Sequence, residues 1–164
     1  MSEMIAAEDL VEGQVIELGS RKVTGNEIVD FARQWDPQWF HTDTDAAARG
    51  HHGGVIASGI HTLAILQRLC VEAFYTRWAV IAGRGFDTLR FTAPVHADDT
   101  LTGSVSIDRV SLDDRRGRVV MGMEMRNQHG APVLAATMTV YLWRRAHIPD
   151  GQLTPGSLPP APSA

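Results

Sequence analysis

Cysteine, concentrated positive charge and long apolar runs are all scarce in this sequence, and each scarcity excludes a class of protein. Cys70 is the single cysteine, so no disulfide can form within the chain. It lies in an apolar run, which favours a buried thiol in a reducing compartment. The formal net charge is -4 and the arginines are scattered, so we do not expect nucleic acid as a partner.

No apolar segment approaches the ~20 residues that span a bilayer. The first residues, "MSEMIAAEDLVEG", lack a basic segment followed by an apolar one, as a signal peptide would have. We therefore expect a cytoplasmic protein with no membrane partner. The 164 residues are 44% hydrophobic and 21% charged, which is typical of one folded globular domain.

The first half of the chain predicts helices. Thr24 and Glu27 form a capping-box pattern before an apolar face at helical spacing, and Pro37 ends that helix. A short helical turn is expected over 46–49, before Gly50. From Val55 to about Arg77 there is no proline and only one glycine among mostly apolar residues, which predicts one long, largely buried helix.

The second half predicts antiparallel sheet. Four runs that resemble strands, over 87–95, 100–112, 118–127 and 131–145, are separated by short turn sequences such as "DDRRG" and "QHG". Hairpins at this spacing predict a meander. We expect a single α+β domain over residues 1–147, in which the sheet wraps the helix, and a disordered tail rich in proline, glycine, serine and alanine over 148–164.

The segment "WDPQWFHTD" places a carboxyl group and an imidazole five residues apart across Pro37. Asp36 follows the negative end of a helix and lies between Trp35 and Trp39, two features that would raise the pKa of its carboxyl group. The bend at Pro37 would bring His41 toward the same space, as proton transfer requires. The same residues also suit a simple turn in which the histidine binds local backbone.

The segment "GGVIASG" places the small residues Ala57, Ser58 and Gly59 at the start of the long helix. Small residues there let a ligand approach free N–H groups and the helix dipole, which stabilise an anionic oxygen. They would equally allow the helix to pack closely against a sheet or a second subunit.

Together the two segments resemble the MaoC-like dehydratases, the family that includes the (R)-specific enoyl-CoA hydratases. Asp36 and His41 match the family's catalytic Asp and His at the same spacing, and Asp43 follows His41 as in the family's "HxD". The segment "GGVIASG" is similar to the one that opens the family's hotdog helix, usually "AHG", and "LRFTAPVHADDTL" is similar to "RF-x-x-PV-x-x-GD-x-L". The resemblance runs from about Thr24 to Trp143.

Three departures from the family pattern leave the substrate open. Ser58 replaces the histidine of "AHG", Gln38 replaces a common asparagine, and Asp98 replaces the glycine before Asp99. A subgroup of the family carries "DPQ-x-FH" together with "ASG", so these departures are features of that subgroup.

The resemblance implies a hotdog fold and a hydro-lyase of fatty acid metabolism that adds water to an enoyl thioester of CoA or a carrier protein, or removes it. Asp36 and His41 would hold the water that attacks C3 while one of them supplies a proton to C2. The N–H of Gly59 would polarise the thioester carbonyl, with help from Ser58.

No cofactor is expected, because the CoA thioester is itself the substrate. Four further residues are expected around that substrate. Gln38 would orient His41 or the water. The expected wall residues are Trp39, Phe40 and Ala57.

No metal is expected. His51 and His52 are adjacent and point apart, and His61 has no carboxylate three or four residues away on its helix. Arg84 and Arg90 suit a CoA phosphate by their chemistry, but an arginine on a strand is more often solvated or paired with an acid. The sequence leaves that contact undecided.

Two other functions remain open. A hotdog thioesterase would direct water at the thioester carbonyl, and a non-catalytic subunit would only bind the acyl thioester. A single hotdog unit exposes an edge strand and one side of its helix, which predicts at least a homodimer. The resemblance implies that the acyl tunnel follows the dimer interface, and it leaves higher assemblies, acyl chain length, branching and carboxylation open.

Overall fold

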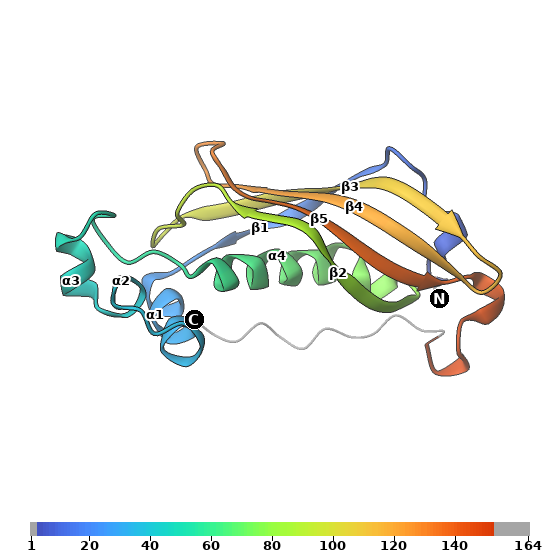
Figure 1. Ribbon diagram of the computed structural model, residues 1–164, viewed down its shortest axis with the longest axis horizontal. Helices are drawn as coiled ribbons and strands as arrows, with labels where there is room; N and C mark the ends of the chain where they lie inside the picture. The colour runs from blue at the N-terminus through green and yellow to red at the C-terminus, as the bar shows by residue number, and fades with distance from the viewer. Residues whose placement is uncertain (1–2, 153–164) are drawn as a thin grey trace.

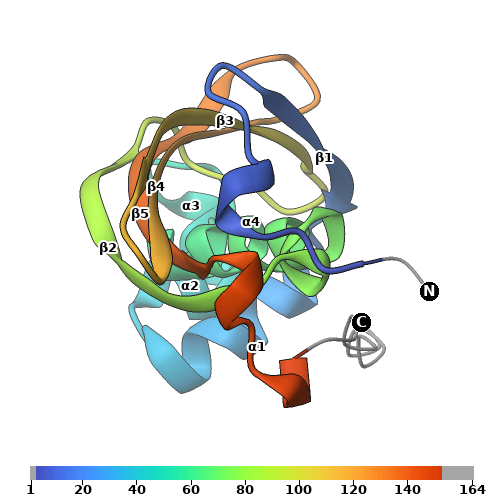
Figure 2. The ribbon, with the colours of Figure 1, turned by 90° about the vertical axis from the view of Figure 1, so that its right-hand side faces the viewer.

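A computed structural model describes residues 3–152 and shows one long helix held in a curved antiparallel sheet (Figures 1 and 2). In chain order the elements are β1 (Val15–Lys22), α1 (Gly25–Trp35), α2 (Trp39–Thr42), α3 (Thr44–Arg49), α4 (Gly59–Ala73), β2 (Val80–Phe91), β3 (Thr100–Leu112), β4 (Arg116–Arg126) and β5 (Pro132–Trp143). This is the predicted α+β arrangement, with the sheet wrapped around α4 as in the hotdog fold.

The strand order is β1-β3-β4-β5-β2, so only part of the expected meander is present. Strands β3, β4 and β5 follow one another as hairpins, and residues 113–115 form the predicted turn between β3 and β4. The expectation that β2 starts this series was wrong, because β2 lies at the far edge beside β5. β2 also begins at Val80 and contains three register shifts, which disrupt the alternation that marks a strand in sequence.

Helix and sheet share one hydrophobic core. Along β4 the buried residues Val119, Met121, Met123 and Met125 alternate with more exposed ones, so one face of the strand turns inward. Ile65, Leu66, Leu69 and Cys70 of α4 belong to the same cluster. Cys70 is fully buried as predicted, and burial raises the pKa of its thiol to about 12.

The long helix is shorter than its sequence suggests. We expected it from Val55 to about Arg77, but α4 begins at Gly59 and ends at Ala73, where a separate 3-10 turn starts at Tyr75. The residues before Gly59 are extended because their backbone pairs elsewhere: Ala57 N–H donates to Val95 O (2.8 Å) and Ile56 forms a bridge with His96. These apolar residues continue the hydrophobic run without continuing the helix.

Asp99 fixes the loop that holds this extended segment. Its carboxylate accepts the N–H of His96 (2.8 Å) and the side-chain amide of Gln128 (2.8 Å). The preceding residue, Asp98, has φ of 70°, a conformation in which glycine is favoured and which matches the glycine common at this place in the family pattern. Val95 and His96 are thereby positioned to pair with residues 56 and 57.

Part of the expected disordered tail is ordered. Residues 150–152 form a 3-10 turn, and the Gln152 side-chain amide donates to Val80 O (2.8 Å), so residues 148–152 do not belong to such a tail. The prediction for 153–164 lies outside the described residues. From residue 3 to residue 152, no helix is long and apolar enough to cross a membrane.

Candidate active site

Helices α1, α2 and α3 gather at the end of the molecule where α4 begins (Figure 1), and the two predicted catalytic side chains lie there. Helix α1 starts with the expected capping box of Thr24 and Glu27. It ends at Trp35, and its C-cap Asp36 has non-helical φ and ψ of -154° and 68°, because Pro37 disfavours the helical conformation before it. The chain then turns into α2 and brings His41 Nε2 to 3.5 Å from Asp36 Oδ2.

The Asp36 carboxylate accepts two hydrogen bonds from side chains. Ser58 Oγ–H donates to Oδ2 (2.6 Å), and the Gln38 amide donates to Oδ1 (2.8 Å). These bonds, in that order of importance, lower the pKa of Asp36, with a further contribution from His41. Our expectation of a raised pKa was wrong, since Trp35 and Trp39 are 67% and 53% exposed and do not enclose the carboxylate.

His41 is buried and held in one orientation. Its Nδ1 lies 2.6 Å from the backbone oxygen of Ile56. A carbonyl oxygen can only accept, so the proton of the neutral ring is assigned to Nδ1 and the lone pair to Nε2. Ile56 is itself fixed, because its N–H donates to Phe40 O (3.3 Å). The arrangement therefore directs the basic nitrogen of His41 toward Asp36.

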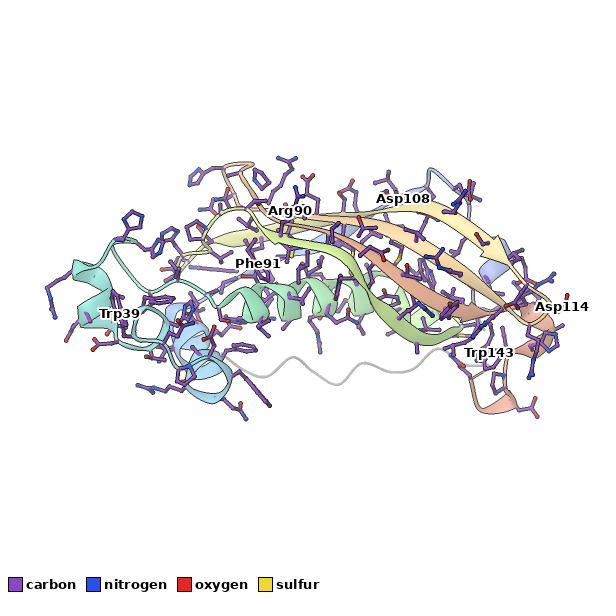
Figure 3. All side chains as sticks on the ribbon, in the orientation of Figure 1. Trp39, Arg90, Phe91, Asp108, Asp114 and Trp143 are labelled. Atoms are coloured by element: carbon purple, nitrogen blue, oxygen red, sulfur yellow. The ribbon has the colours of Figure 1, made fainter. Side chains whose placement is uncertain are left out.

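The first turn of α4 completes the group. Ser58 is the N-cap: its Oγ accepts the N–H of Ile60 (3.3 Å) while its proton is donated to Asp36. The N–H of Gly59 donates to no acceptor within residues 3–152. A Cβ on Gly59 would lie 2.6 Å from the Phe91 ring, so only glycine fits beneath this ring as it is placed. Figure 3 shows Phe91 beside this end of α4.

A cavity of about 340 Å³ opens beside these groups. Its wall contains the following residues: His41, His52, Ile56, Ala57, Gly59, Thr62, Phe91, Thr92, Ala93, Pro94 and Val95. A water or a small acyl group in this space would therefore meet the imidazole of His41 and the start of α4 together. Asp36 is not among the wall residues and borders the site through His41 and Ser58.

The structure brings most of the predicted site residues together, but two predicted wall residues, Trp39 and Phe40, do not line the cavity. Ala57 lies in the cavity wall, whereas Trp39 lies in a separate hollow of about 100 Å³ with Gly50 and His51. Phe40 also borders that hollow, and its ring meets the His41 ring edge-on at 4.4 Å between centroids. A substrate bound in the cavity would therefore touch neither Trp39 nor Phe40 as we expected, and Phe40 borders the site only through its contact with the His41 ring.

Sequence reasoning missed the far wall of the cavity. Phe91, Thr92 and Pro94 come from the segment "LRFTAPV", which resembled the family but was assigned no role in the site. Thr62 follows the N-cap by one helical turn, a spacing that could have revealed it.

Arg84 donates to the Tyr141 hydroxyl (3.3 Å) on the sheet. Among residues 3–152 no three histidine, cysteine or acidic side chains are arranged to hold a metal ion.

Comparisons with known proteins find relatives in both sequence and fold. The family described as "MaoC like domain" matches residues 9–129. YdeM, an uncharacterized protein of Bacillus subtilis, is 34% identical over 133 residues, which cover 80% of this chain and 94% of YdeM. The 3-hydroxyacyl-thioester dehydratase Z of Mycobacterium tuberculosis is 34% identical over 94 residues, 56% of this chain and 61% of that protein.

Among solved structures, the MaoC-like dehydratase from Rhodospirillum rubrum matches with a TM-score of 0.77 and 30% sequence identity. The match covers 86% of this chain and 98% of the other. The course of the backbone is thus similar over most of the chain, at a sequence identity of 30%.

Proposed function

This chain belongs to the MaoC-like dehydratase family, and from that premise we propose that it is a hydro-lyase that adds water to the double bond of a 2-enoyl thioester, or removes it from the 3-hydroxyacyl thioester. The observation that carries the proposal is the meeting of three groups: His41 and Gly59, whose N–H is free, line one cavity, and the Asp36 carboxylate lies behind that wall at 3.5 Å from His41 Nε2. The name of dehydratase Z, a 3-hydroxyacyl-thioester dehydratase, supports the substrate class.

Asp36 and His41 would act together on one water molecule. The lowered pKa keeps Asp36 ionised, and the Nδ1 proton of His41 is engaged by Ile56 O, so Asp36 Oδ2 and His41 Nε2 both present lone pairs. At 3.5 Å apart they can accept the two protons of a single water, which leaves the water's own lone pair free to attack C3. The pair takes one proton from the water and returns it to C2, so the enzyme ends unchanged.

The negative charge that develops on the thioester oxygen during the reaction needs a hydrogen-bond donor beside that oxygen. The Gly59 N–H lies at the positive end of α4, where the helix dipole and the unpaired amide favour an anionic oxygen. We had given Ser58 a role at this carbonyl, but its one proton is donated to Asp36. Its proposed role is therefore to hold the carboxylate and to cap the helix that carries Gly59.

The family membership supports an acyl thioester as substrate. We propose that this substrate is an acyl-CoA or an acyl-carrier thioester of fatty acid metabolism, that no cofactor is used, and that the protein is cytoplasmic. A thioesterase or a non-catalytic binding subunit would use the same cavity without hydrating C3, so the products separate the three.

The test is a parallel assay with crotonyl-CoA and longer enoyl-CoAs. Loss of enoyl absorbance and release of free thiol are followed in the same samples. Enoyl loss without thiol supports the hydro-lyase. Thiol release indicates a thioesterase. If the whole panel gives no enoyl loss and no thiol release, the hydro-lyase is contradicted and a non-catalytic binding subunit is the remaining function.

Substitution of either member of the pair should remove hydration. Asp36→Asn loses the charge that accepts the water proton, and His41→Ala loses the Nε2 lone pair. Each should lower kcat by about 10²- to 10⁴-fold, the usual contribution of a general acid or base. Asp30→Asn on the exposed side of α1 is the matched control and should keep full activity. Full activity of either pair variant would contradict the mechanism.

We further propose a homodimer. Strand β2 is a free sheet edge and most of its residues are exposed, while Ile60 on α4 and Phe91 on β2 are exposed apolar side chains. A second copy would cover all three features by a two-fold contact. Light scattering should give twice the 17.9 kDa of the chain, or a multiple of that pair, and a monomer at micromolar concentration would contradict the proposal.

A further inference from the structure

His52 is a polar wall residue of the cavity to which the proposed reaction gives no role. It lies in the turn between α3 and the extended segment at Val55, where Gly53 has φ of 68° and donates its N–H to Gly50 O (3.2 Å). The rings of His51 and His52 are 5.0 Å apart and nearly perpendicular. Both histidines border the hollow near Trp39, and His52 also borders the catalytic cavity.

The other polar side chains of the cavity wall have already used their protons. The Thr62 hydroxyl donates to Ser58 O (3.3 Å), the Thr92 hydroxyl donates to Pro132 O (2.7 Å), and His41 donates to Ile56 O. The remaining side chains of the wall are apolar. Within residues 3–152 the His52 ring makes a ring contact with His51 and no hydrogen bond. His52 is therefore the one wall side chain with a donor available to a bound molecule.

We propose that His52 determines specificity by donating a hydrogen bond to a carboxylate on the acyl part of the thioester. The inference rests on the proposed function, because it takes the cavity to be the acyl site. An imidazole has an N–H donor in either protonation state, and a bond to an ionised acceptor is stronger than one between neutral groups. A purely alkyl chain would cover this donor without pairing it, which lowers its relative affinity.

The size of the cavity agrees with a short acyl group. About 340 Å³ lies at the lower end of the ~300–1,000 Å³ typical of small-molecule sites. A chain of four or five carbons that ends in a carboxylate would place its charge within this space. The substrate class is thus a short enoyl thioester with a carboxylate substituent.

Binding of two thioesters that cannot be hydrated tests this directly. Glutaryl-CoA carries the carboxylate, and 5-methylhexanoyl-CoA has the same shape with methyl groups in place of the two carboxylate oxygens. The readout is the ratio of their dissociation constants by calorimetry. The CoA part is common to both, so a contact between His52 and the pantetheine arm cancels in that ratio.

His52 is exposed in the free protein, so its bond to the carboxylate competes with water, and His52→Ala should shift the ratio against glutaryl-CoA by about three- to tenfold. His51→Ala is the matched control and should leave the ratio unchanged, and His52→Gln, which keeps an N–H donor, should restore part of it. An unchanged ratio in His52→Ala, or an equal shift in His51→Ala, overturns the inference.

The binding test of His52 and the hydration assay of the proposed function can fail independently of each other. A ratio that depends on His52 in a protein that hydrates no enoyl-CoA would sustain the acyl recognition and reject the hydro-lyase. Hydration that proceeds with no such dependence would sustain the hydro-lyase and reject the role of His52.

Discussion

At the scale of single residues, Ser58 links the two halves of the site. Its hydroxyl donates to Asp36 and accepts from the first turn of α4, so one side chain fixes both the base and the helix that carries Gly59. It is fully buried, and this geometry explains why a serine can stand where related sequences have histidine. The carboxylate is held ionised by hydrogen bonds, which is the opposite of what its position after a helix suggested.

Ser58→Ala should raise the pKa of Asp36, because the bond from Ser58 is the largest cause of its lowering. Loss of the N-cap should also lower the free energy of unfolding by about 1 kcal/mol. A carboxyl group with a lowered pKa stabilises the fold above its ordinary pKa of 3.8 and loses that contribution as the pH falls through the folded value. The variant should therefore be less stable at neutral pH, and its free energy of unfolding should fall less on acidification below pH 3.8 than that of the original protein.

Carbon-13 NMR titration of the Asp36 carboxyl group measures the shift directly. Gln38→Ala should shift the same resonance less, and Ser104→Ala on β3 should leave it unchanged. A titration of Asp36 in Ser58→Ala that coincides with that of the original protein would contradict this account.

At the scale of elements, the position of α4 depends on groups outside it. The strand pairing of Ile56 and Ala57 and the cap at Ser58 fix its first residue, and an apolar run alone cannot reveal either feature. The same first turn packs against α1, where His61 stacks on Phe31 with 4.5 Å between ring centroids. His61 Nδ1 is buried and has no hydrogen-bond partner within the described residues.

Acidification should weaken the contact between α1 and α4. Burial lowers the pKa of His61, and Arg21 adds to the lowering while Glu27 opposes it. The unfolded chain binds a proton near pH 6.5 that the folded chain does not, so stability is lost as the pH falls from there toward the folded pKa. His61→Phe keeps an aromatic ring on Phe31 and removes this titration.

Urea unfolding at pH 7.5 and pH 5.5 tests the prediction. The free energy of unfolding should fall less between the two pH values in His61→Phe than in the original protein. His129→Ala, on the exposed turn between β4 and β5, is the control and should follow the original protein. Equal losses in His61→Phe and the original protein would rule out His61 as the cause.

At the scale of the whole molecule, the sequence predicts the helix wrapped by a sheet better than it predicts the order of the strands in that sheet. Capping residues, alternating strands and the apolar run fix the element types, and the helix within a curved sheet follows from them (Figure 2). The place of β2 could not be predicted, because bulges disrupt its pattern and strand order depends on contacts far apart in sequence. Even so, the approach of Asp36 to His41 was predicted from spacing.

The rest of the site depended on contacts between distant segments. Ser58 reaches Asp36 across 22 positions, and residues 91–95 form the far wall of the cavity. Neither local spacing nor composition carries this information. Such contacts also explain why Trp39, next to the catalytic segment in sequence, borders a different hollow. Figure 3 places Trp39 at the end of the molecule formed by the short helices, Phe91 nearer the middle beside the start of α4, and Trp143 and Asp114 at the opposite end.

The central claim is that water held by Asp36 and His41 is added to C3 of the acyl chain. The most direct measurement is mass spectrometry of products formed from crotonyl-CoA and from a short enoyl-CoA with a terminal carboxylate, in water enriched in oxygen-18. The account predicts one oxygen-18 atom in the C3 hydroxyl of an intact 3-hydroxyacyl-CoA. Label found only in the carboxylate of a released, unhydrated acid would contradict it.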